Sequence, residues 1–308
     1  MRCAALLLAF VVAGIGPARV DPDAPPSPSP ETPAVLFNHF FAVTDAATYA
    51  EAQANRFLTK EFAPFEKRTT VRNDQTYTGI YFYGRRTYFE LFEPGAQGAA
   101  GASGLAFGVE TQGQSARVKA LWAEAAGGAE GGPVTRRTDA EDVPWFEMTF
   151  ATGGRPTPGA DAAFRLWLME YDKDFLARWY PDLTPARSIT RADVLDRYVA
   201  RIGQGARRGT YLMKDVVALT LALPAEDRER LASQLRAVGY AVHDDAGALA
   251  ITGPDVRLRV VLAEESVRGV REAEFSLQTR VPRAQHRFGT AVLTVEADRA
   301  RLRLGESR

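Results

Sequence analysis

The 308-residue chain is poor in the side chains that most often carry metal and nucleophile chemistry. It has one cysteine, Cys3, and three histidines, His39, His243 and His286. A single cysteine excludes a disulfide framework and thiolate zinc sites, and three widely spaced histidines leave no HExxH motif. The chain also lacks the GxxxxGK[ST] and GxSxG motifs of P-loop proteins and serine hydrolases.

An excess of charge of either sign is absent as well, because 38 basic side chains are balanced by 38 acidic ones. Proteins that bind nucleic acid neutralise phosphates with a basic excess, so this balance argues against a nucleic-acid partner. With 46% hydrophobic and 25% charged residues, the composition is that of an ordinary globular protein. The length is enough for about two domains.

The one long apolar run lies at the N-terminus. Arg2 precedes an apolar stretch over residues 4–15, and small residues follow up to Ala18. This pattern predicts a secretory signal peptide over residues 1–18 and a secreted or periplasmic protein. The run is shorter than the ~20 residues that a membrane span needs, so we expect no span after cleavage.

Proline is concentrated just after this segment, since residues 21–33 hold six of the chain's 18 prolines. Proline fixes φ and removes a hydrogen-bond donor, so residues 19–34 are predicted to be an extended tether. The folded chain then begins near Val35. We expect a first domain over residues 35–174, a helical connector over 175–214 and a C-terminal α+β module over 215–305.

One order of elements repeats along the folded chain. The first occurrence comprises a strand, a helix and two strands at residues 35–43, 46–59, 76–83 and 87–92. The second comprises the same elements at residues 105–110, 115–126, 145–151 and 164–171. Placing the two first strands side by side aligns Phe41 with Phe107 and Val43 with Val109. A third occurrence over 216–263 predicts that the C-terminal module is a related or degenerate copy.

Four segments carry a resemblance to a known superfamily: NHFFAVTD (38–45), TYFELFEPG (87–95), GASGLAFGVE (101–110) and RLWLMEYDKD (165–174). They resemble the vicinal-oxygen-chelate superfamily of glyoxalase-like proteins, bleomycin-resistance proteins and extradiol dioxygenases. The resemblance implies an α+β fold in which paired βαβββ modules, at about 35–95 and 101–174, form cupped mixed sheets. The whole chain also resembles secreted bacterial proteins that carry this domain.

The resemblance also implies a site. In that superfamily the first and last strands of each module hold a divalent metal inside the cup. This places His39 at the first-strand position, Glu90 on the last strand of module one and Glu170 on the last strand of module two. Module two offers Leu105 or Phe107 where a further histidine or glutamine is expected. The implied site is a divalent metal held by His39, Glu90 and Glu170, with Glu90 or Glu170 as the catalytic base.

The residues themselves leave other interpretations open. His39 lies two residues after Phe37 and two residues before Phe41, so we expect all three side chains on one face of a strand, toward a packed interior. There a carboxylate of Glu90 or Glu170 is a suitable partner for the imidazole without any metal. In the opposite register, either carboxylate faces solvent.

The favoured function is therefore a secreted glyoxalase-like protein with metal-dependent lyase, isomerase or dioxygenase chemistry on a small oxygenated molecule. One alternative is a metal-free protein that sequesters an apolar small molecule in an aromatic cup. Another is an interaction module whose cup is filled by its own side chains. The missing ligand of module two favours these alternatives, and a pocket that joins His39 and Glu90 would exclude the last.

Overall fold

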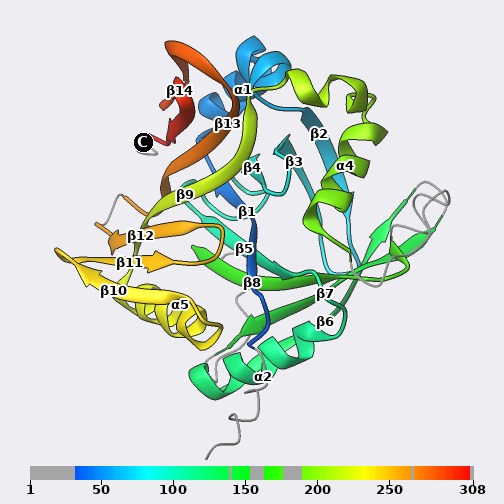
Figure 1. Cartoon of the computed structure of the whole chain (residues 1–308), viewed down its shortest axis with the longest axis vertical. Coiled ribbons are helices and arrows are strands. Elements are labelled where there is room, and N and C mark those ends of the chain that lie inside the picture. The colour runs from blue at the N-terminus through cyan, green and yellow to red at the C-terminus, as the bar shows by residue number, and fades with distance from the viewer. Residues whose placement is uncertain (1–31, 139–140, 153–162, 176–188, 265–266, 306–308) are drawn as a thin grey trace, which may run out of the picture. The chain divides into compact units, whose positions relative to one another are not determined.

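The computed structural model describes residues 32–138, 141–152, 163–175, 189–264 and 267–305 (Figure 1). The predicted signal peptide and most of the predicted tether fall on residues 1–31, outside the described residues. The first part of the predicted connector, residues 176–188, lies outside them too. Two mixed sheets account for most of the unit that begins at Thr32.

The first sheet has eight strands in the order β2-β3-β4-β1-β5-β8-β7-β6. Helices α1 (Ala46–Ala54) and α2 (Gln114–Ala126) follow β1 and β5. β1 and β5 pair antiparallel at the centre, and each pairs in parallel with the last strand of its own half, β4 or β8. The paired βαβββ modules of a cupped sheet are therefore confirmed. The strands are β1 (Leu36–Val43), β2 (Phe65–Val71), β3 (Thr76–Tyr83), β4 (Tyr88–Phe92), β5 (Ser103–Val109), β6 (Ala129–Arg137), β7 (Asp142–Ala151) and β8 (Phe164–Tyr171).

The second sheet repeats half of this arrangement. Its order is β10-β11-β12-β9-β13-β14, and β9 pairs in parallel with β12 and antiparallel with β13. This repeats the pairing of β1 with β4 and β5, so a third βαβββ module is followed by a long hairpin. The elements are β9 (Met213–Leu223), α5 (Ala225–Ala237), β10 (Ala241–Asp245), β11 (Ala248–Thr252), β12 (Arg257–Leu262), β13 (Gly269–Phe288) and β14 (Ala291–Arg303). The predicted relation of the C-terminal module to the first two is confirmed.

Local signals fix where the first helix begins and ends. Asp45 Oδ1 accepts from the backbone N–H of Thr48 at 2.8 Å and caps the N-terminus of α1. The predicted helix 46–59 stops at Ala54 because Asn55 begins a new turn. Asn55 Oδ1 accepts from Leu58 N at 3.1 Å, and a short π-helix, η1 (Leu58–Phe62), follows.

Alternation along the strands divides the first sheet into two faces. The outer face, with Phe40, Phe89 and Leu105, forms one continuous core with Leu219 and Phe275 of the second sheet. The opposite face, called the cup face below, carries separate aromatic clusters. The C-terminal sheet therefore backs the cup through a shared core and is not an independent lobe.

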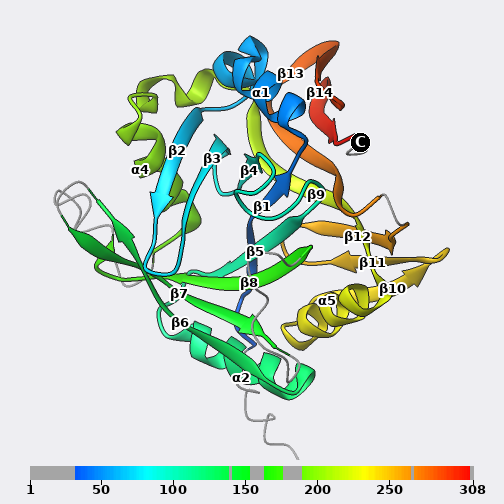
Figure 2. The same ribbon diagram turned by 180° about the vertical axis from the view of Figure 1, so that it is seen from behind.

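Helices join the two halves at one end of this core. Trp122 of α2 is fully buried and donates its indole N–H to the carbonyl oxygen of Gln234 in α5 at 3.0 Å. Both views show α2 and α5 side by side (Figure 2). On the cup face, the α-helix of the predicted connector, α4 (Arg191–Arg201), stacks Tyr198 on Tyr83 with 5.7 Å between ring centroids, and a short 3-10 helix, η2 (Gly205–Thr210), follows it.

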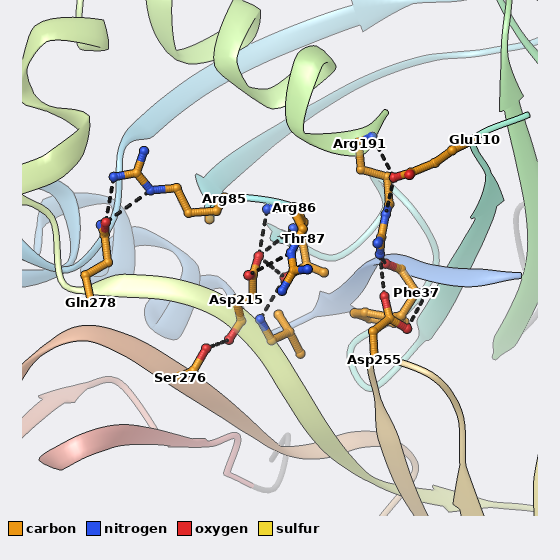
Figure 3. Close-up of polar contacts among 12 residues, drawn as sticks. Phe37, Arg85, Arg86, Thr87, Glu110, Arg191, Asp215, Asp255, Ser276 and Gln278 are labelled. Atoms are coloured by element: carbon orange, nitrogen blue, oxygen red, sulfur yellow. Dashed lines mark hydrogen bonds and ion pairs between the residues drawn. The ribbon is translucent and has the colours of Figure 1, made fainter. Parts of the chain in front are cut away.

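Polar groups also join β9 to the turn between β3 and β4 (Figure 3). Asp215 Oδ1 accepts from the backbone N–H groups of Arg86 and Thr87 at 2.7 and 3.1 Å. The hydroxyl of Thr87 accepts from Val216 N at 2.7 Å. Because Asp215 and Thr87 are buried, their polar groups need these partners, and the turn is held in register with β9.

Arg191, the first residue of α4, connects three parts of the chain (Figure 3). Its Nε donates to Glu110 Oε1 at 3.0 Å, and its Nη1 lies 2.5 Å from Asp255 Oδ2 and also donates to the carbonyl oxygen of Phe37. Asp255 Oδ1 accepts from Phe37 N at 3.1 Å. Both backbone groups of Phe37 are thus satisfied by one ion pair from outside the sheet.

We predict that Arg191→Met lowers the free energy of unfolding by about 3 kcal/mol, because it leaves two carboxylates and a buried carbonyl without their partner. Urea unfolding measures the change. Arg137→Met is the matched control, since the Arg137–Asp142 pair is exposed and its loss is expected to change the free energy of unfolding little. Equal losses in the two variants would contradict the role assigned to Arg191.

Candidate functional site

An extra residue in β1 turns His39 into the cup. Phe37 lies opposite Phe107 of β5, whereas His39 lies opposite the next residue, Ala106, so the register shifts between them. Such a bulge changes the face that the following side chains take. Phe37 packs in the core between the sheets, and His39 and Phe41 line the cavity on the cup face. The expectation that Phe37 and His39 share a face is therefore corrected.

Three neighbours orient the imidazole of His39. Asn38 Oδ1 lies 3.0 Å from Nδ1, which assigns the ring proton to Nδ1 and leaves a lone pair on Nε2. The ring of Tyr88 stacks on the imidazole at 4.2 Å between centroids, and Trp167 contacts it edge-on at 5.4 Å. His39 is 4% exposed, so its position is set by these contacts.

Glu90 faces His39 from the neighbouring strand β4. Its Oε1 lies 3.6 Å from His39 Nε2. Burial raises the pKa of Glu90 to about 7, although the guanidinium of Arg68 acts in the opposite direction. Burial, together with Arg68, lowers the pKa of His39 to about 3. The pair therefore holds one proton over the range between these two values.

The pair opens into a cavity of about 290 Å³ on the cup face. Aromatic side chains form most of its walls, among them Phe41, Tyr77, Phe92, Trp145, Phe146 and Trp167. A second bulge, at Trp145 of β7, helps to turn both Trp145 and Phe146 toward this side. Arg72, Asp74, Gln97 and Arg165 supply the polar part of the lining.

The strand register identifies the residue of module two that corresponds to His39. On the antiparallel pair β1–β5, His39 lies opposite Ala106 and Phe41 lies opposite Gly104. A half-turn that exchanges the two modules places β1 on β5 and exchanges these two residue pairs. Under this operation His39 corresponds to Gly104, and Phe41 corresponds to Ala106. The sequence alignment of Phe41 with Phe107 is therefore shifted by one residue, because it does not allow for the bulge.

The same register identifies the counterpart of Glu90. Phe41 pairs with Glu90 of β4, and its counterpart Ala106 pairs with Trp167 of β8. Trp167 thus stands where a second carboxylate would stand. A Cβ on Gly104 would lie 2.4 Å from Phe41 Cε1 and 2.8 Å from Trp167 Cζ3, so the two rings occupy the space of any larger residue there.

Glu170 lies on the other side of the sheet. Its two carboxylate oxygens accept from the backbone N–H groups of Gly113 and Ser115, each at 2.7 Å, at the N-terminus of α2. A carboxylate there satisfies backbone donors and complements the helix dipole. The structure therefore brings His39 and Glu90 together and does not bring Glu170 to them. Leu105 and Phe107 also lie in the core between the sheets.

This donor set does not fit the divalent metal that the resemblance implies. Within the residues that the structure describes, no three His, Cys, Asp or Glu side chains are grouped to hold an ion. Catalytic metal sites take about three protein ligands, and His39 and Glu90 provide two. The positions that would complete the set are Gly104 and Trp167, which offer no ligand atom.

A family model described as a family of unknown function (DUF5829) matches residues 37–302 of the chain. The chain belongs to this DUF5829 family. The matched region contains His39, Glu90 and both sheets, so the cup and its backing are parts of one family domain. No curated protein matches the chain.

Several solved structures show similarity to the chain. A hypothetical protein from Staphylococcus aureus is 10% identical, with a TM-score of 0.45 over 76% of this chain and 88% of that one. A xylose isomerase-like TIM barrel/4-hydroxyphenylpyruvate dioxygenase fusion protein is 16% identical, with a TM-score of 0.38 over 80% of this chain and 35% of that one. An extradiol ring-cleaving dioxygenase from B. fuscum is 15% identical, with a TM-score of 0.37 over 76% and 56%.

Sequence reasoning passed over Arg165, although a signal was present. In FRLWLMEY (164–171), Arg165 shares its strand face with Trp167 and Met169, as a charge among large apolar side chains. A charged residue at such a position is buried at a cost unless it has a partner or a function.

In the described part of the chain, no helix is long and apolar enough to cross a membrane.

We predict that Glu90→Gln makes the free energy of unfolding depend on pH in a range where the wild-type His39–Glu90 pair contributes no pH dependence. Between pH 4.5 and 6.5, the ordinary values of Glu and His, the unfolded chain holds one proton on His39 and the folded pair also holds one. Without Glu90, the folded chain holds none. Stability then falls as pH falls through this window, by up to about 1.4 kcal/mol per pH unit relative to the wild type.

Chemical unfolding at a series of pH values measures this difference. Glu93→Gln is the matched control, because Glu93 is exposed three residues further along. Its curve is expected to run parallel to the wild-type curve. A parallel curve for Glu90→Gln would show that His39 and Glu90 do not share a proton.

Proposed function

We propose that the cup of the eight-stranded sheet binds a small organic molecule with a planar ring, and that it does so without a metal. The observation that carries the proposal is the cavity of about 290 Å³ that joins His39 and Glu90 to aromatic walls. Gly104 and Trp167 stand at the second pair of ligand positions and offer no ligand atom, and the rings of Phe41 and Trp167 occupy the space there.

The size and lining of the cavity favour a ligand over a filled core. Protein interiors pack with few voids larger than a water molecule, whereas ligand pockets begin at about 300 Å³. Edge-on and tilted aromatic contacts, such as those of Trp167 with His39 and Phe41, suit a flat ring. A cup filled by its own side chains, as in an interaction module, would leave no such space.

A second candidate function is acid–base catalysis on the bound molecule, and the Glu90–His39 pair favours it. A carboxyl group with a pKa of about 7 exchanges a proton readily near neutral pH. In its ionised form Glu90 takes a proton from a carbon or oxygen of the ligand, and in its protonated form it returns one to another atom. An isomerase or lyase reaction of this kind needs no metal.

Residues 1–18 have the pattern of a secretory signal, so we place the binding activity in the periplasm or outside the cell. This rests on the sequence pattern of that segment alone.

We predict that planar aromatic and heteroaromatic compounds bind the purified protein and that Trp167→Leu weakens this binding at least tenfold, because it removes one wall of the cavity. Thermal shift screening finds the ligands, and titration calorimetry measures their affinity. Phe65→Leu is the matched control, since Phe65 packs against the core on the outer face of the sheet. Its effect on affinity is expected to stay within twofold.

Metal independence is checked in the same titration. Excess EDTA is expected to leave the affinity unchanged, whereas a loss of binding that a divalent cation restores would contradict the metal-free cup. If the two substitutions weaken binding equally, the ligand does not occupy this cavity.

A further inference from the structure

Two buried donors in the cup lack an acceptor. Arg165 Nε and Trp145 Nε1 have no hydrogen-bond partner among the described residues, although both side chains line the cavity. Arg165 is 9% exposed and Trp145 is 5% exposed. Both side chains are donors only, so the two groups cannot satisfy each other. An acceptor on a molecule bound in the cavity would satisfy these donors.

Arg165 is also a cation without a counter-anion. Its Nη2 donates to the backbone and side-chain oxygens of Gln97, each at 2.8 Å, and its guanidinium lies 4.7 Å from the ring of Phe41. All of these partners are uncharged. By contrast Arg72, in the same lining, binds both oxygens of Asp74 at 2.7 and 2.6 Å. In the described lining, the charge of Arg165 is the one left without an ion-pair partner.

Burial lowers the pKa of Arg165 to about 10 and the carboxyl group of Glu90 acts in the opposite direction through space, but no ion pair joins these two groups in the described structure. Glu90 is on β4 and Arg165 is on β8, and β1 and β5 lie between these strands. Three strand spacings of about 4.8 Å separate their backbones by roughly 14 Å. Glu90 is engaged with His39 instead. The cup therefore has an acid–base wall and a cationic wall.

The two unsatisfied donors stand far apart along the strands. In the β7–β8 ladder, Phe146 lies opposite Tyr171, so Trp145 is near the end of β8 that is remote from Arg165. Six residues at about 3.3 Å each separate Arg165 from Tyr171 by roughly 20 Å of strand. A single small anion does not reach both donors, whereas an elongated molecule spans more of this distance.

We propose that the ligand of the cup is an elongated aromatic carboxylate whose carboxylate group binds Arg165 and whose ring lies against Trp167. The proposal rests on the proposed binding function and adds the ligand's charge and orientation to it. Carboxylate oxygens match guanidinium donors in geometry and charge, which makes this pairing stronger than one between neutral groups. The far end of the ligand points toward Trp145, whose indole N–H favours an acceptor there.

The test compares 2-naphthoate with 2-naphthamide by titration calorimetry on the full protein. The two probes have the same ring system and differ in the charge of one group. We expect naphthoate to bind at least tenfold more tightly than naphthamide. This comparison needs no substitution, so it holds even if a variant fails to fold.

Arg165→Gln then tests the assignment to one residue. It is expected to weaken naphthoate binding at least tenfold and to change naphthamide binding by less than threefold. Arg137→Gln, at an exposed position, is the matched control and is expected to change neither.

The outcomes separate the two levels of the proposal. Equal affinity for the two probes, or a preference for naphthoate that persists in Arg165→Gln, overturns the anionic ligand and leaves the binding function standing. Absence of binding by both probes overturns the aromatic carboxylate and, together with an empty compound screen, the binding function as well.

Discussion

Arg191 and Asp255 bind the carbonyl and the N–H of Phe37 at the one point where β1 carries an extra residue. A bulge leaves backbone groups outside the regular ladder, and in a buried strand those groups need partners. The ion pair supplies them from α4 and from the loop before β12. Because the bulge sends His39 into the cup, the geometry of the site depends on residues more than 150 positions further along the chain. The C-terminal sheet adds to this support through the core that it shares with the outer face.

The second constraint is the pair of residues in module two that corresponds to His39 and Glu90. The pairing of β5 with β8 places Trp167 where module one has Glu90, and Gly104 leaves room for its ring. A tryptophan ring can be accommodated there only if the residue that it covers on the neighbouring strand, Gly104, is small. The two residues therefore act together: neither offers a ligand atom to the cup, and the space beside Gly104 lets Trp167 form a flat wall.

Much of this was accessible from sequence, and the failures have particular causes. The recurring order of apolar and aromatic strand segments and helices predicted the repeated modules, and the resemblance singled out His39 and Glu90, which the structure brings together. β2 and β6 were not predicted because their sequences, FEKRTTV and AEGGPVTRR, are charged or rich in glycine. Glu170 was assigned to the cup although a shift of one residue along a strand reverses the face. The bulge in β1 has no local pattern, since the partners that stabilise it come from Arg191 and Asp255.

The near-symmetric backbone of the two modules carries an asymmetric set of side chains. Acid–base groups stand on module one, and the arginine and the tryptophan stand on module two. A site with matching ligands on both modules would present the same surroundings to a molecule and to the same molecule turned by 180°. This cup distinguishes them, so a ligand whose ends differ has one preferred direction of entry, and the two faces of its ring meet different surroundings. On the proposed binding function, the cup is therefore selective for one orientation of its ligand.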